Sequence, residues 1–186
     1  MFPDFNIYSS SLLILSLQGL VLVLLHLRKY QKQRDRSHFL LSVILIIMCY
    51  QQTTYTLGFM GWYDTYRTTK INYFLVNTNY ALAPLIYLYI KSICNPELKP
   101  RNRFWIHFIP FIIAVIIKLG IWFYDSNQPG FDLVQNGEFV VAIQWKYIDP
   151  VSIMLSIIQM IIYLVISFLT LFQYRERIRQ FFSTTY

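Results

Sequence analysis

Residues 83–111 read APLIYLYIKSICNPELKPRNRFWIHFIPF, and this stretch decides the fold. An apolar, aromatic run ends at Lys91, a short turn with two prolines and three cations follows, and Trp105 opens a second apolar run. Two apolar runs joined by a short basic turn are typical of membrane-spanning helices that meet on one side of a bilayer. The stretch therefore predicts a corner between two transmembrane helices.

The rest of the chain has the composition of a membrane protein. Of its 186 residues, 56% are hydrophobic and only 13% are charged, whereas a soluble domain carries about 25% charged residues. The net charge of +7 does not indicate nucleic-acid binding by this segment, because the cations lie in short loops beside apolar runs. Cys49 lies in an apolar run and Cys94 near the basic turn, which favours two plain thiols over a disulfide.

Five apolar runs are each close to the roughly 20 residues that cross a bilayer. They cover about residues 10–27, 39–58, 71–90, 104–124 and 148–172. The third run is the least hydrophobic, because several asparagines interrupt its first half. No cleavable signal peptide precedes the first run. We therefore predict one all-α membrane domain over residues 1–186, with five transmembrane helices.

The Lys and Arg residues lie mainly on one side of the predicted helices. Twelve of them occupy the loop after the first run, the corner after the third and the tail after the fifth, and three occupy the opposite loops. Such an excess marks the cytoplasmic side. The sequence thus predicts a multi-pass protein with its N-terminus outside and its C-terminus in the cytoplasm.

The segment between the fourth and fifth runs is the one external stretch with a pattern of its own. It contains FDLVQ-NG-EFVVA, in which two apolar-leaning runs flank residues 136–137. Because an Asn-Gly pair favours the positive φ angles of a two-residue turn, we predict a small external β-hairpin here. An irregular loop is the alternative.

No catalytic motif is visible, so the sequence does not predict an enzyme. His26, His38 and His107 lie at similar predicted depth and could form a metal cluster. No Cys, Asp or Glu accompanies them at ligand spacing, and they are better interpreted as interfacial polar residues. We predict neither a metal site nor a cofactor.

Polar residues inside the apolar runs indicate a candidate site. Gln51, Asn77 and Lys118 each lie about 10 Å inside the outer end of their helix, at 1.5 Å per residue. Ionisable residues in a membrane usually face the bundle interior or water, which predicts an outward-facing cavity. The candidate ligand-binding residues are Gln51, Tyr55, Tyr73, Asn77, Tyr80, Lys118 and Asp149. The alternatives are that Lys118 extends to the headgroups, and that the other groups only join helices by hydrogen bonds.

Three short motifs carry a resemblance to a known family. APLIYLYIKS, a basic turn and WIHFIPF resemble the N-terminal membrane domain of AraC-type helix-turn-helix regulators of Bacteroidetes-like bacteria. SLQGLVLVLLHLRKY near the start and YRERIRQFFSTTY at the end are similar to that family as well. The resemblance implies a bundle of about seven helices followed by a cytoplasmic DNA-binding domain. This chain would then be a fragment that holds five of those helices.

The resemblance therefore implies a sensory input domain in a bacterial inner membrane. Its expected partners are the lipid bilayer, an unknown small molecule or lipid, a second copy in a homodimer, and DNA only through the missing C-terminal domain. The membrane domain of a sensor histidine kinase remains an alternative. A small transporter or acyltransferase component is another.

Overall fold

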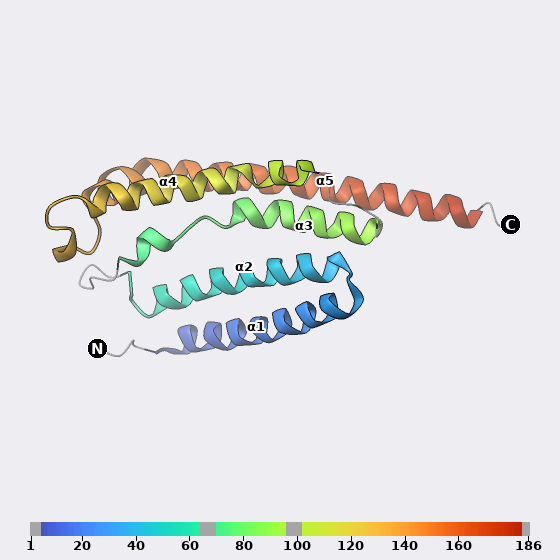
Figure 1. Ribbon diagram of the computed structural model, residues 1–186, viewed down its shortest axis with the longest axis horizontal. Coiled ribbons are helices and arrows are strands. Elements are labelled where there is room, and N and C mark those ends of the chain that lie inside the picture. Colours follow the sequence, from blue (N-terminus) through green and yellow to red (C-terminus); the bar gives the residue numbers. More distant parts are fainter. Residues whose placement is uncertain (1–4, 64–69, 96–101, 184–186) are drawn as a thin grey trace.

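Five α-helices run roughly side by side in the computed structural model, which describes residues 5–63, 70–95 and 102–183 (Figure 1). The helices are α1 (Ile7–Gln33), α2 (Arg36–Phe59), α3 (Asn79–Cys94), α4 (Ile109–Ser126) and α5 (Asp149–Ser183). Three 3-10 segments, η1 (Ile71–Phe74), η2 (Asn102–Phe108) and η3 (Phe131–Leu133), and the π-helical segment η4 (Val140–Ile148) complete the described elements. Within these ranges no residue forms a β-strand, so the described fold is all-α.

Four helical stretches are long and apolar enough to span a membrane. They are Ile7–Gln33, Arg36–Phe59, Phe104–Ser126 and Val140–Phe181. Large hydrophobic side chains are exposed along α1, α4 and α5, which is unfavourable in water and favourable in lipid. The chain is therefore a multi-pass membrane protein, as predicted.

Helices α1 and α2 form an antiparallel hairpin. The Asp35 carboxylate caps α2 by accepting a hydrogen bond from the Ser37 backbone N–H at 2.9 Å. This bond holds the pKa of the Asp35 carboxyl below its usual range.

The two helices approach closely where a Cβ on Gly19 would lie 2.4 Å from the Cys49 Sγ. Both cysteines, Cys49 and Cys94, are free thiols, as predicted.

The third predicted helix, residues 71–90, is wrong in its first half. After η1 the backbone is not helical until α3 begins at Asn79. A side chain of α2 satisfies backbone groups there, because the Tyr50 hydroxyl donates to the Phe74 carbonyl at 2.7 Å and accepts from the Val76 N–H at 3.1 Å. Polar side chains of this kind offer the backbone an alternative to helix. α3 has 16 residues and is about 24 Å long, which is shorter than the roughly 30 Å hydrocarbon core.

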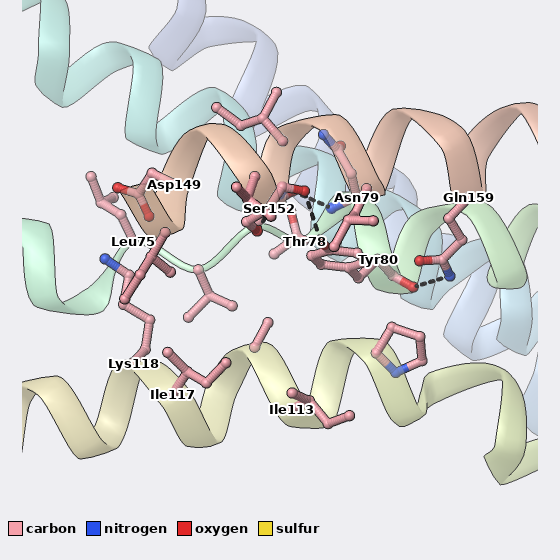
Figure 2. A pocket seen from close by; sticks show the side chains of 18 of the residues that line it. Leu75, Thr78, Asn79, Tyr80, Ile113, Ile117, Lys118, Asp149, Ser152 and Gln159 are labelled. Atoms are coloured by element: carbon pink, nitrogen blue, oxygen red, sulfur yellow. Dashed lines mark hydrogen bonds between the residues drawn. The ribbon is translucent and has the colours of Figure 1, made fainter. Parts of the chain in front are cut away.

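Helix α3 lies between α2 and α5 and carries much of the buried core (Figure 1). Pro84, inside this helix, has no N–H to donate to the Tyr80 carbonyl four residues earlier. The Gln159 side chain of α5 donates to that carbonyl instead, at 3.2 Å (Figure 2). A neighbouring helix thus satisfies the group that the proline frees.

The predicted β-hairpin around residues 136–137 is wrong. The second of its two runs is helical and continues through η4 into α5. The Asp125 carboxylate at the end of α4 caps this helix, accepting from the backbone N–H groups of Phe139 at 3.1 Å and Val140 at 3.2 Å. The first N–H groups of a helix lack partners within it, and a buried carboxylate supplies them here.

Segment η4 and helix α5 form one unbroken helical stretch from Val140 to Ser183. α5 alone has 35 residues, about 52 Å, and extends past the α1–α2 turn and the end of α3 (Figure 1). We call this end the basic end, because the α1–α2 turn and the tail of α5 carry most of the described cations. The opposite end is the far end. The predicted cytoplasmic cations Lys99 and Arg101, and Arg67 of the predicted outer loop, lie outside the described residues.

Candidate functional site

A cavity of about 1320 Å³ lies between α2, α3, α4 and α5. Residues 75–78, which link η1 to α3, form part of its wall, so the late start of α3 helps to create it. α4 lines one side and α5 the other (Figure 2). In the described part of the chain these two helices make little direct contact with each other. Sites for small molecules usually measure about 300–1000 Å³, so this cavity is large enough for a lipid-sized ligand.

The structure brings six of the seven predicted site residues to this cavity. The residues that line it are Gln51, Tyr55, Asn77, Tyr80, Lys118 and Asp149. Tyr73 is instead buried at the far end of the bundle, where its hydroxyl donates to Asp125 Oδ2 at 2.7 Å and accepts from the Gly137 N–H at 2.6 Å. That a ligand binds in the cavity stays a prediction.

Lys118 extends from α4 into the cavity toward the first turn of α5, where Asp149 lies (Figure 2). Its ammonium group donates to the Asn72 carbonyl at 2.9 Å. This bond to the chain itself supports an inward-facing lysine over one that only reaches the headgroups. Within the described residues no ion pair joins Lys118 to Asp149, whose carboxylate accepts hydrogen bonds from Gln144.

Gln144 is a site residue that the sequence did not reveal. Its Nε2 donates to both carboxylate oxygens of Asp149, at 3.3 and 3.1 Å. The side chain is 1% exposed, and its Oε1 has no hydrogen-bond partner among the described residues. The π-helical winding of η4 pairs backbone groups five apart, which brings residues 144 and 149 onto one face. The sequence analysis placed Gln144 in an external segment outside the fifth predicted helix, so no helical spacing linked it to Asp149.

Several of the predicted polar residues also hold the helices together. The Tyr80 hydroxyl donates to the Ser152 carbonyl at 2.7 Å, and Asn77 Nδ2 approaches Ser152 Oγ at 3.5 Å. These bonds tie α3 and the segment before it to α5. The expected interhelical hydrogen bonding and the expected cavity are therefore both present, on the same side chains.

The remaining walls of the cavity are mainly apolar and end in an aromatic cluster. Isoleucines of α4 and α5 line the long sides, namely Ile113, Ile117, Ile121, Ile158, Ile162 and Ile166. Toward the basic end, His107 Nδ1 and the Tyr163 hydroxyl share a hydrogen bond of 2.7 Å, and Tyr87 packs edge-on against His107. The cavity is thus amphipathic, with its charged groups near the far end.

The three histidines do not meet. His26 and His38 lie across the α1–α2 hairpin, with their Nδ1 atoms 3.1 Å apart, while His107 contacts Tyr163 of α5. Within the described ranges, no group of three His, Cys, Asp or Glu side chains could hold a metal ion.

Comparisons with protein-family models, with curated proteins and with solved structures found no match to this chain. The family resemblance therefore stays a prediction, and the function has to be argued from the geometry of the cavity and of α5.

Proposed function

We propose that residues 1–186 are the membrane-embedded sensory input domain of a transcriptional regulator. In this proposal a ligand from the outer side or from the bilayer binds in the cavity, and the signal reaches a cytoplasmic DNA-binding domain beyond Tyr186. The motif resemblance to AraC-type regulators supplies the DNA-binding partner.

One observation carries the proposal: α5 lines the cavity with its first half and projects past the other helices at its C-terminal end. Asp149, Ser152 and Gln159 contact the cavity, and the same helix continues to Ser183, past the α1–α2 turn (Figure 1). A continuous helix transmits a tilt or rotation along its length, because every turn is hydrogen-bonded to the next. Movement at the cavity is therefore expected to move the projecting tail.

The proposed mechanism is a shift between two arrangements of α4 and α5. The two helices make little direct contact in the described residues, so the contents of the cavity help to set the distance between them. A ligand can shift the equilibrium only if it binds one arrangement more tightly than the other. We place the basic end in the cytoplasm and the N-terminus outside the bacterial inner membrane, following the charge asymmetry.

The proposal is tested by rotating the tail of α5 about the helix axis relative to the part of α5 that lines the cavity. Two alanines inserted between Phe172 and Gln173 rotate everything downstream by about 200°, whereas seven alanines restore the phase to within about 20°. The inserts are made in the intact gene product and compared by transcript profiling with the parent and with a deletion strain. We expect the two-residue insert to change the regulated transcripts and the seven-residue insert to preserve them.

Transcript profiling of the deletion strain and of the inserts, together with chromatin immunoprecipitation, can refute the proposal. If deleting the gene alters no transcripts, or if the intact gene product enriches no DNA in chromatin immunoprecipitation, it is not a transcriptional regulator. If both inserts behave like the parent, α5 is not the transmitting element.

A further inference from the structure

The cavity is long as well as large. Its lining runs from Ile106 to Ile121 on η2 and α4, and from Asp149 to Ile166 on α5. At 1.5 Å per residue these walls are about 22 and 26 Å long, which is most of the roughly 30 Å hydrocarbon core. Long apolar walls with charged groups near one end match an amphiphile that lies along the membrane normal. They do not match a compact water-soluble molecule.

The charged end of the cavity holds one cation and one anion that are not paired with each other. Lys118 donates to the Asn72 carbonyl, and Asp149 accepts from Gln144 Nε2. An ammonium has three donors and a carboxylate about four acceptor positions, so both groups keep unused capacity. A buried polar group whose donor or acceptor positions have no hydrogen-bond partner raises the free energy of the folded state.

Two further acceptors in the cavity wall have no partner within the described residues. Gln144 Oε1 is buried beside Asp149, and Gln159 Oε1 is buried deeper along α5. An ionised carboxylate can only accept hydrogen bonds, so a ligand group beside Asp149 has to donate. The site therefore calls for a negative group next to Lys118 and for a positively charged N–H donor next to Asp149.

We propose that the cavity binds a phospholipid whose headgroup carries both a phosphate and a primary ammonium group. The phosphate accepts from Lys118 Nζ, the ammonium donates to the Asp149 carboxylate, and the acyl chains lie between the isoleucines of α4 and α5. This rests on the proposed sensory function and names the class of its ligand.

The charge balance selects this headgroup over its common alternatives. A purely anionic amphiphile would bring a like charge to Asp149 and leave the site with a net charge. A trimethylammonium head carries the right charge but has no N–H to donate to the Asp149 carboxylate. An apolar helix, of this chain or of a second copy, would cover Lys118 and Asp149 without hydrogen-bonding either.

The experiment measures lipid retention by the purified full-length chain. The protein is equilibrated with vesicles of phosphatidylethanolamine, phosphatidylcholine or phosphatidylglycerol, washed in detergent, and analysed by native mass spectrometry. We expect stoichiometric phosphatidylethanolamine, retained at least about tenfold better than the other two. The Lys118→Met variant is expected to lose about tenfold in retention, because it removes a charge-assisted hydrogen bond to the phosphate.

A matched pair of variants tests the path of the acyl chain. Ile117 lines the cavity, whereas its neighbour Ile116 is 62% exposed on the outside of α4 and is not among the described residues that line it. Ile117→Trp fills the cavity and is expected to lower retention about tenfold, and Ile116→Trp is expected to retain the lipid like the parent. The pair remains informative even if Lys118→Met fails to fold.

Three outcomes would overturn the lipid assignment. They are equal retention of all three lipids, equal behaviour of the two tryptophan variants, and cross-links that place a protein helix in the cavity. None of these readouts involves DNA or transcription. Selective lipid retention without any transcriptional effect of the α5 inserts would therefore defeat only the proposed function, and the reverse result would defeat only the lipid assignment.

Discussion

At the residue scale, Pro84 and Gln159 are coupled through one carbonyl. The proline leaves the Tyr80 carbonyl without a helix partner, and the Gln159 amide donates to it from α5. Gln159→Leu removes this donor but also removes a buried Oε1 that has no partner among the described residues, so its own effect on stability is expected to be small. In Pro84→Ala, the new N–H satisfies the carbonyl and the amide of Gln159 loses its role.

A double-mutant cycle tests this coupling. We expect Gln159→Leu to be less favourable in the parent than in Pro84→Ala, with a coupling of about 1 kcal/mol in the free energy of unfolding. Unfolding of the four variants in detergent micelles measures it. Gln18→Leu on the exposed face of α1 is the control and should not depend on Pro84. Equal effects of Gln159→Leu in both backgrounds would refute the coupling.

At the element scale, a close approach of two segments fixes the start of the helical stretch that continues through η4 into α5. A Cβ on Gly137 would lie 2.2 Å from the Asp125 Cγ, so only glycine lets the chain pass the carboxylate that caps Phe139 and Val140. The Tyr73 hydroxyl bonds to both segments and closes the network. This network, and not strand pairing, organises the far end.

We therefore expect Gly137→Ala to lower the free energy of unfolding by about 1–3 kcal/mol, because the clash displaces the capping carboxylate. Gly120→Ala on α4 is the matched control: a Cβ there meets no described atom within 4 Å, and alanine favours the helix by up to about 1 kcal/mol. Denaturation followed by circular dichroism compares the two variants. If Gly137→Ala is tolerated as well as Gly120→Ala, the close approach does not determine this element.

At the scale of the whole molecule, the orientation that we propose in the membrane rests on the asymmetry of charge between the two ends. Leu133 is 86% exposed at the far end, and Arg179 lies in the exposed tail of α5 at the basic end. In the proposed orientation these positions lie on opposite sides of the bilayer. Cys49 and Cys94 are the two cysteines of the chain, and replacing both by alanine gives a background without native thiols.

In that background, we expect an impermeant maleimide to label Leu133→Cys in intact cells and Arg179→Cys only after the cells are opened. The reason is that cations are retained on the cytoplasmic side. Ile161→Cys, on the lipid-exposed face of α5, is the control and should stay unlabelled in both conditions. Labelling of Arg179→Cys in intact cells would reverse the proposed orientation.

The sequence by itself determined the membrane class, the approximate positions of four spanning helices and six of the seven residues that were expected to share a cavity. Each of these follows from local hydrophobicity, because a backbone in lipid has to satisfy its own hydrogen bonds as a helix. Lys118 stood out for the same reason, since a charge within an apolar run is costly.

Only the tertiary structure decided where α3 begins, that the Asn-Gly pair leads into a helix instead of a hairpin, and that Gln144 belongs to the site. In each case a partner distant in sequence, or an unusual helical winding, satisfies polar groups that local propensity would have assigned otherwise. The Tyr50 hydroxyl meets the Val76 N–H, Asp125 meets Val140, and the π-helical turn brings Gln144 to Asp149. Hydrophobic periodicity carries no record of such long-range bonds, which arise only when the helices pack.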